Sequence, residues 1–254
     1  MLQKTHSHLV IFLTIFTLTS FAVQESKTII YLIGDSTIAT KEVKAYPETG
    51  WGMPFQYFFD STVVIENHAK NGRSTRTFIS ENRWSPIETK LKKGDYVFMQ
   101  FGHNDESKEK TDRYTTPEEY KRNLTKFISE ARGKGATPVL LTPVSRRKFV
   151  EGKQQETHAL YSTLVKEVAL SEKVAFIDLD ALSREYYQNM GEENSKLLFL
   201  QLEAGEHPNY PEGKIDNTHF SEMGARKIAQ IVLTEIKRLD LPLAKYIYKP
   251  VPKK

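Results

Sequence analysis

The chain contains no cysteine among its 254 residues. Disulfide bonds, thiolate catalysis and a lipid-anchored N-terminal cysteine are therefore excluded, and the fold must depend on its apolar core. A strong excess of one charge is also absent. The 36 lysines and arginines face 32 acidic residues, a net charge of +4, which gives little support for nucleic-acid binding. We find no internal repeat and no low-complexity linker, and the length suits one α/β domain.

One long apolar run lies at the N-terminus. The stretch LVIFLTIFTLTSFA follows Lys4 and ends in small residues at the −3 and −1 positions of a cleavage site, the last being Ala22. This pattern predicts a secretory signal at residues 1–22 and a mature domain at 23–254 that is secreted or periplasmic. The alternative is an uncleaved membrane anchor. It fits less well, because the run is shorter than the roughly 20 residues that span a bilayer.

Short apolar, β-branched runs alternate with longer amphipathic stretches along the rest of the chain. We expect strands at 28–34, 61–69, 95–102, 136–143 and 173–179, and helices at 54–59, 85–94, 117–135, 155–170 and 221–239. Nearly continuous apolar strands separated by helices are typical of a parallel sheet covered on both faces. The sequence therefore predicts a three-layer α/β/α sandwich with a five-stranded parallel sheet.

Polar residues that can do chemistry follow the predicted strands. In open parallel sheets, ligands lie beyond the carboxyl ends of the strands. The candidates are Ser36 after the first strand, Gly72 after the second, Asn104 after the third, and Asp216 and His219 in the loop before the last helix. We therefore expect four separate segments to meet at one edge of the sheet.

Ser36, Asp216 and His219 have the residue types of a hydrolytic triad. A serine hydroxyl needs a base to take its proton, and histidine is the usual base near neutral pH. The histidine needs an acceptor for its other ring nitrogen, and Asp216 lies three residues before it. Taken alone, Ser36 could be a helix N-cap, and the Asp–His pair a surface turn. We interpret Asp35 as structural, orienting the turn before Ser36.

Acyl transfer also needs donors for the oxyanion that forms on the substrate. The candidates are the backbone N–H groups of Ser36 and Gly72 and the side-chain amide of Asn104. Glycine at position 72 permits a tight turn with no Cβ against the substrate. Alternatively, Gly72 could be a plain turn residue and Asn104 a strand-end cap. Together with the triad, the set suggests acyl transfer to water.

The four segments resemble the four conserved blocks of the SGNH, or GDSL-type, hydrolases in order and spacing. The matching stretches are GDST at 34–37, Gly72, GHND at 102–105 and DNTH at 216–219. Within that superfamily, NHAKNGRSTRTF, FGHND, GWG and DNTHFSEMGA resemble the rhamnogalacturonan acetylesterases. The resemblance implies a flavodoxin-like sandwich and a serine esterase without metal or cofactor. It also implies a pectic polysaccharide with acetyl groups as the substrate.

The resemblance also assigns roles to residues. It implies Ser36 as nucleophile, His219 as base and Asp216 as its partner, with Ser36, Gly72 and Asn104 forming the oxyanion hole. The chain has no Gly-x-Ser-x-Gly elbow, so the α/β-hydrolase fold is disfavoured.

The other histidines give no sign of a metal site. His68, His158 and His207 lack acidic neighbours at the spacing of zinc ligands, and we expect no metal. His103, inside GHND, lines the cleft or holds a loop.

Four further features bear on substrate binding. Aromatic residues usually lie in the core, but Trp51, between two glycines, is the first to test for stacking on a sugar. Arg73 belongs to a basic stretch whose default interpretation is a solvent-exposed surface. The alternative is that Arg73 binds a galacturonate carboxylate with two hydrogen bonds. The segment 184–213 is longer than a crossover needs and is expected to build one wall of the cleft. The stretch at 197–202 is expected to be buried.

The main hypothesis is an exported carbohydrate O-deacetylase. Its partner would be an acetylated polysaccharide or oligosaccharide, with no nucleic acid and no stable membrane insertion after signal cleavage. One alternative keeps the fold and the chemistry in a lipase, lysophospholipase or thioesterase. Another is a non-catalytic carbohydrate-binding protein, which an intact triad argues against.

Overall fold

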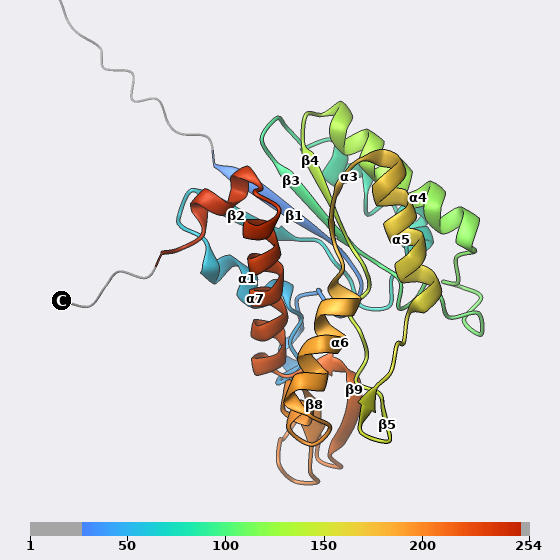
Figure 1. Ribbon diagram of the computed structural model, residues 1–254, viewed down its shortest axis with the longest axis vertical. Helices are drawn as coiled ribbons and strands as arrows, with labels where there is room; N and C mark the ends of the chain where they lie inside the picture. Colours follow the sequence, from blue (N-terminus) through green and yellow to red (C-terminus); the bar gives the residue numbers. More distant parts are fainter. Residues whose placement is uncertain (1–26, 250–254) are drawn as a thin grey trace, which may run out of the picture.

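The computed structural model describes residues 27–249, and Figure 1 shows their arrangement. The expected signal at 1–22 and the last residues of the basic tail, 250–254, lie outside the described residues. Five strands form one parallel sheet in the order β2-β1-β3-β4-β7. Their bounds are β1 Thr28–Gly34, β2 Val63–Asn67, β3 Tyr96–Gln100, β4 Thr137–Leu141 and β7 Ala175–Ile177. The predicted fold class is confirmed.

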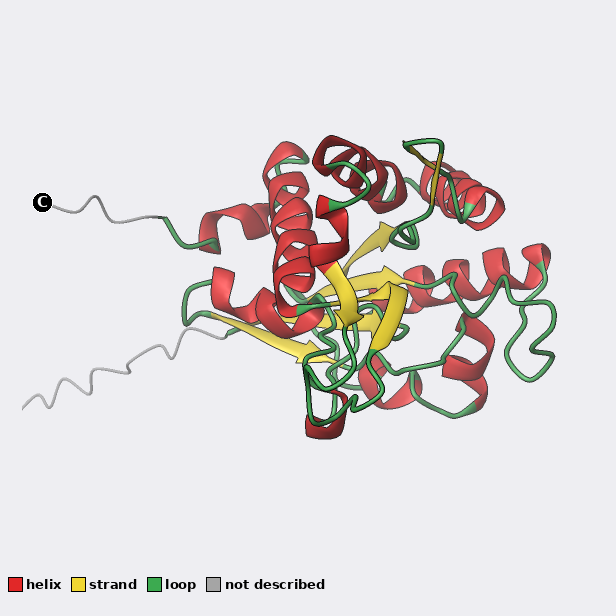
Figure 2. Ribbon diagram, turned by 90° about the horizontal axis from the view of Figure 1, so that it is seen from below, coloured by secondary structure: helices red, strands yellow, loops and turns green. Residues whose placement is uncertain are grey.

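Helices cover both faces of the sheet, as Figures 1 and 2 show. One face carries α1 (Gly52–Phe55), α6 (Leu179–Met190) and α7 (Glu222–Arg238). The other carries α2 (Thr75–Ser80), α3 (Ser85–Glu88), α4 (Pro117–Gly133) and α5 (Ala159–Glu172). Short 3-10 helices occupy Val43–Ala45, Gln56–Phe58, Asn194–Leu198 and Pro242–Tyr246. In residues 27–249, no helix is long and apolar enough to cross a membrane.

Alternation along each strand explains the two covered faces. In β1, Ile30 and Leu32 pack into the core that contains α7, whereas Tyr31 and Ile33 pack into the core that contains α4. Side chains at successive strand positions point to opposite faces, so a strand buried on both faces becomes a continuous apolar run. This is the pattern that made the strands visible in the sequence.

The order of strands creates a switch point at β1. β2 pairs with one edge of β1, and β3 returns to pair with its other edge. In an open α/β sheet, ligands bind where the strand order reverses in this way. Gly34 of β1 lies beside Gln100 of β3. The segments that follow these two residues, which carry Ser36 and Asn104, therefore start from neighbouring positions.

Two antiparallel hairpins lie outside the sheet, formed by β5 (Phe149–Val150) with β6 (Lys153–Gln154) and by β8 (Phe199–Leu202) with β9 (Lys214–Phe220). The prediction that Asp216 and His219 lie in a loop is wrong, because both residues lie in β9. β9 is largely polar and pairs with one strand only, so it lacks the apolar alternation that marks a strand. Helices α2 and α6 are further elements that were not predicted from the sequence.

Candidate active site

Ser36 lies in a tight turn directly after β1. Gly34 ends the strand where the backbones are too close for a side chain, because an added Cβ would lie 2.3 Å from the carbonyl oxygen of Gln100. Oδ1 of the buried Asp35 accepts the backbone N–H of Thr37 at 2.9 Å and its hydroxyl at 2.8 Å. These bonds hold the turn, in agreement with the structural role predicted for Asp35.

The structure brings Ser36, His219 and Asp216 into one hydrogen-bonded chain. The hydroxyl of Ser36 lies 2.9 Å from Nε2 of His219, and Nδ1 of His219 lies 2.8 Å from Oδ2 of Asp216. Burial alone would raise the pKa of Asp216, but its hydrogen bonds and charge interaction with His219 hold that pKa well below its usual range. Asp216 is therefore ionised, and it can orient the ring and stabilise an imidazolium.

A bulge in β9 makes this alignment possible. Phe220 pairs with Phe199, but Ile215 pairs with Gln201, so four residues of β9 bulge opposite one of β8. Within the bulge, Oδ1 of Asp216 accepts the backbone N–H groups of Thr218 and His219 at 2.8 and 2.9 Å. A bulge redirects side chains away from strict alternation. Both members of the Asp–His pair can thus face Ser36.

Three side chains from outside β9 hold the bulge in place. The amide of Gln201 donates to the carbonyl oxygen of Asp216 at 2.9 Å, and Nη1 of Arg147 lies 3.2 Å from Oδ1 of Asn217. Nη1 of Arg146 donates to the hydroxyl of Thr218 at 2.9 Å. The Asp–His pair is therefore held by partners on β8 and on the segment after β4.

Donors for a negative oxygen lie beside Ser36. In the described part of the chain, the backbone N–H groups of Ser36 and Gly72 have no hydrogen-bond acceptor. Gly72 has a φ of +76°, a conformation that favours glycine. The amide of Asn104 donates to the carbonyl oxygen of Arg73 at 3.1 Å, which ties it to the turn that contains Gly72. That bond uses one amide hydrogen and leaves the second available.

A buried lysine, which was not among the predicted site residues, joins the two turns. The side chain of Lys41 is 2% exposed. Its Nζ donates to the carbonyl oxygen of Ser36 at 2.6 Å and to Oδ1 of Asn71 at 3.0 Å, and it pairs with Glu48 at 2.6 Å. Because Asn71 precedes Gly72, Lys41 sets the spacing between the two unpartnered N–H groups. Lysines are usually exposed, so the sequence carried no signal for this position.

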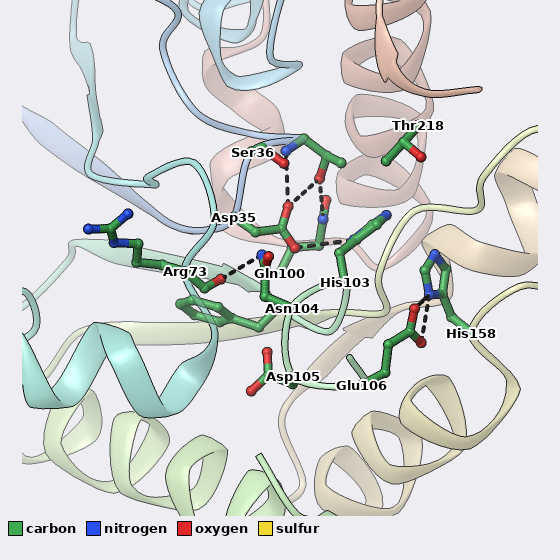
Figure 3. Close-up of polar contacts among 12 residues, drawn as sticks. Asp35, Ser36, Arg73, Gln100, His103, Asn104, Asp105, Glu106, His158 and Thr218 are labelled. Carbon is green, nitrogen blue, oxygen red and sulfur yellow. Dashed lines mark hydrogen bonds and ion pairs between the residues drawn. The ribbon is translucent and has the colours of Figure 1, made fainter. Parts of the chain in front are cut away.

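A chain of buried hydrogen bonds supports the Ser36 turn from below, part of which Figure 3 shows. The indole N–H of Trp51 donates to Oε1 of Gln100 at 2.7 Å, and the Gln100 amide donates to the hydroxyl of Thr37 at 2.6 Å. Trp51 is 0% exposed. The idea that it stacks on a sugar is therefore wrong, because its ring is enclosed in the core.

His103 completes this support. Its Nδ1 lies 3.2 Å from Oδ2 of Asp35, and its ring packs on His158 with 4.3 Å between the centroids. Burial lowers the pKa of His103 to about 4, although the Asp35 carboxylate opposes the shift. Burial would raise the pKa of Asp35, but His103 and the bonds from Thr37 lower it to about 2. At neutral pH, a neutral His103 donates to an ionised Asp35. His103 thus holds a loop.

The acidic residue of GHND also has a structural place. Oδ1 of the buried Asp105 accepts the backbone N–H of Thr75 at 2.9 Å and its hydroxyl at 2.6 Å, at the start of α2. Burial raises the pKa of Asp105 to about 7.

The remaining candidates have partners of their own. Arg73 pairs through Nε with Glu81 at 2.9 Å, and the same carboxylate pairs with Arg83 at 2.5 Å. Nε2 of His68 lies 3.0 Å from Glu66. Among residues 27–249, no group of three or more His, Asp or Glu side chains is arranged to hold a metal ion.

The segment 184–213 folds into the end of α6, a 3-10 helix, β8 and a long turn. That turn packs on the loop after Ser36. Asn209 donates to the carbonyl oxygen of Tyr46 at 2.8 Å, and the hydroxyl of Tyr210 donates to that of Ala45 at 2.8 Å. Leu198 is buried within it, as expected, whereas Leu197 is exposed.

Comparisons with known proteins agree with this architecture. Residues 32–227 match the family model described as the GDSL-like lipase/acylhydrolase family. The chain is 42% identical over 219 residues to rhamnogalacturonan acetylesterase RhgT of Bacillus subtilis, covering 86% of this chain and 93% of that one. It is 37% identical to the probable rhamnogalacturonan acetylesterase YesY of the same organism, covering 87% and 97%. The crystal structure of the Bacillus subtilis protein YxiM superposes with a TM-score of 0.74 at 27% identity, covering 85% of this chain and 58% of that one.

Replacing Lys41 tests whether it positions the backbone N–H groups of Ser36 and Gly72. Lys41→Met keeps the side-chain length and removes Nζ. We expect kcat for p-nitrophenyl acetate to fall by about tenfold or more, less than the direct loss of an oxyanion donor, with little change in KM. The double variant Lys41→Met/Glu48→Gln removes the unpaired carboxylate and serves as the stability control. Wild-type kcat in a folded double variant would show that Lys41 does not position the donors.

The buried His103 predicts a pH-dependent stability. Its pKa is about 4 in the folded protein and near 6.5 when unfolded, so the unfolded chain binds more protons between these values. The His103 contribution is therefore lost as pH falls from 6.5 to 4, by at most about 3 kcal/mol. Asp105, with its raised pKa, acts in the opposite direction over much of this range.

Comparison with a variant isolates the histidine. We expect wild-type protein to lose more of its free energy of unfolding than His103→Gln between pH 6.5 and 4, as measured by denaturant titration. Parallel pH curves for the two proteins would contradict this account.

Proposed function

The chain belongs to the GDSL-like lipase/acylhydrolase family, and from that premise we propose that it is a serine esterase that removes O-acetyl groups from a pectic polysaccharide. The observation that carries the proposal is the chain of hydrogen bonds from Ser36 through His219 to Asp216, beside two unpartnered backbone N–H groups. The names of the two Bacillus subtilis relatives support an acetylated pectic substrate for this chain as well.

The reaction begins with attack of the Ser36 hydroxyl oxygen on the acetyl carbonyl carbon. Nε2 of His219 takes the hydroxyl proton, and the ionised Asp216 stabilises the resulting imidazolium. The negative oxygen of the tetrahedral intermediate accepts hydrogen bonds from the N–H groups of Ser36 and Gly72 and from the amide of Asn104. Donors that are fixed in place before the substrate arrives cost little reorganisation energy in the transition state.

The second half of the reaction regenerates the enzyme. The ester C–O bond breaks as His219 gives its proton to the departing sugar oxygen, leaving an acetyl group on Ser36. Water then attacks this acetyl carbon while His219 takes a proton from it. Collapse of the second intermediate breaks the bond to Ser36, whose oxygen recovers the proton, and acetate leaves.

An accessible catalytic pair suits a large substrate. The side chain of His219 is 27% exposed and that of Asp216 is 16% exposed. A polymer can therefore present an acetyl group to Ser36 without entering the protein. Export would place the enzyme where such polymers occur, and residues 1–22 have the composition of a secretory signal.

Acetate release from natural glycans tests the proposed activity. Wild-type protein should release acetate from acetylated pectin faster than from acetylated xylan or chitin fragments. Ser36→Ala should lower the rate by roughly a thousandfold or more, because the nucleophile is lost. Equal, low release by wild type and Ser36→Ala from every glycan would favour the non-catalytic alternative.

The same preparation separates the acetylesterase from a lipase or thioesterase. An acetylesterase turns over p-nitrophenyl acetate faster than long-chain p-nitrophenyl esters, because the longer acyl chain gains nothing at the site. Faster turnover of the long-chain esters would overturn the deacetylase assignment while leaving the family chemistry intact.

The proposed export predicts a defined mature N-terminus. When the full chain is expressed with its own N-terminal segment in a bacterial host that secretes proteins, the protein outside the cytoplasm should begin at Val23. N-terminal sequencing or intact mass measures this. Protein retained in the cytoplasm or membrane with residues 1–22 attached would contradict the proposal.

A further inference from the structure

A cavity of about 700 Å³ lies next to the active site, and neither Ser36 nor His219 lines it. Its walls come from the loop after the Ser36 turn, from α1 and the residues after it, from the end of β2 and from the first turns of α7. The lining is mixed. Met53 and Met223 supply apolar surface, and Tyr46 and Tyr57 supply rings. Arg226 supplies a positive charge and Glu222 a negative one.

The guanidinium of Arg226 has no acidic partner. It lies over the Phe58 ring, with 5.6 Å from Cζ to the ring centroid. Within residues 27–249 it makes no hydrogen bond and no ion pair. Glu222, four residues earlier on α7, is placed where helical Glu–Arg pairs usually form, but its Oε2 accepts the hydroxyl of Tyr46 at 3.0 Å. Arg226 therefore keeps its donors for a ligand, and a guanidinium fits a carboxylate with two parallel hydrogen bonds.

Exposed aromatic rings accompany this cation. Tyr57 is 66% exposed and Tyr46 is 46% exposed, and the Tyr46 ring contacts His207 of the long turn at 5.5 Å between centroids. An exposed tyrosine ring offers an apolar face and a polar tip, a combination that suits a sugar with its C–H face and hydroxyl groups. The cavity thus combines surfaces for a ring with a donor for a negative charge.

The chain itself limits the distance between this cavity and the triad. Thr40 lines the cavity four residues after Ser36, and Glu222 lines it three residues after His219. At a maximum of about 3.5 Å per residue, their Cα atoms lie within about 14 Å of Ser36 and about 11 Å of His219. A polymer with one unit at Ser36 can therefore place a nearby unit in the cavity.

We propose that this cavity is a subsite for a uronate unit of the polymer substrate, with the sugar carboxylate bound by Arg226 and the ring held against Tyr57 or Tyr46. The inference rests on the proposed function, since it extends that substrate beyond the acetylated sugar. Arg73 has fewer donors for this interaction, because its Nε pairs with Glu81 and its Nη1 donates to the carbonyl oxygen of Asn71.

Kinetics on matched polymers test the subsite. The substrates are acetylated galacturonan with free carboxylates, the same polymer with its carboxylates methyl-esterified, and p-nitrophenyl acetate. For Arg226→Ala, we expect the KM on the free-acid polymer, relative to that on p-nitrophenyl acetate, to rise about fivefold, the upper range for an exposed ion pair. The rise should be much smaller on the methyl-esterified polymer. Arg226→Lys should recover only part of the loss.

Arg122→Ala is the matched control. It removes the same charge from the exposed surface of α4, on the opposite face of the sheet, and should leave the ratio of KM values unchanged. Equal rises for Arg226→Ala and Arg122→Ala would show only a general charge effect. Equal rises for Arg226→Ala on both polymers would show that Arg226 does not bind the carboxylate, and either result would overturn the subsite.

A binding measurement separates this inference from the proposed activity. Deacetylated galacturonate oligosaccharides are titrated calorimetrically into Ser36→Ala and into Ser36→Ala/Arg226→Ala. We expect about fivefold weaker binding to the double variant, and equal affinities would overturn the subsite even if wild type releases acetate. Absence of acetate release by wild type, with the affinity difference intact, would instead reject the activity and leave a uronate-binding cavity.

Discussion

The hydrogen bond between the Ser36 hydroxyl and the His219 ring is the interaction on which the site depends. It joins residues 183 positions apart in the sequence, one after the first strand of the sheet and one in a hairpin outside it. The parallel sheet brings Ser36 to its carboxyl edge, but it does not place the histidine. The β9 bulge does that, because Asp216 binds two backbone N–H groups with one carboxylate oxygen and the imidazole with the other.

Buried polar side chains hold the active-site segments together. Asp35 organises the Ser36 turn and receives His103 from the loop after β3. Lys41 links that turn to the one that contains Gly72. Each contact takes a polar group out of water, which costs free energy unless its partners are well placed. These buried polar contacts lie at one edge of the sheet, where the oxyanion donors must keep fixed positions.

The sequence predicts those parts of the molecule that repeat or follow a general rule. The apolar run from Ile30 to Ile33 predicts a strand buried on both faces. Because ligands lie beyond the carboxyl ends of parallel strands, Ser36 directly after this strand is a predicted site residue. The bulge in β9 could not be predicted from the sequence, because its geometry depends on hydrogen bonds from the backbone N–H groups of Thr218 and His219 to the Asp216 side chain. The prediction for Trp51 fails because a tryptophan between two glycines has the same sequence pattern whether its ring is buried or exposed. Lys41 gave no signal, since two of its three partners are a backbone carbonyl and a side chain 30 residues away.

Chemical labelling gives the most direct test of the central claim that Ser36 is a hydroxyl activated by His219. The protein is treated with an organophosphorus reagent that phosphonylates activated serines, and the adduct is located by peptide mass mapping. The account predicts one major adduct, on Ser36, with labelling strongly slowed in His219→Ala. A major adduct on another residue, or labelling of Ser36 at an unchanged rate in His219→Ala, would contradict it.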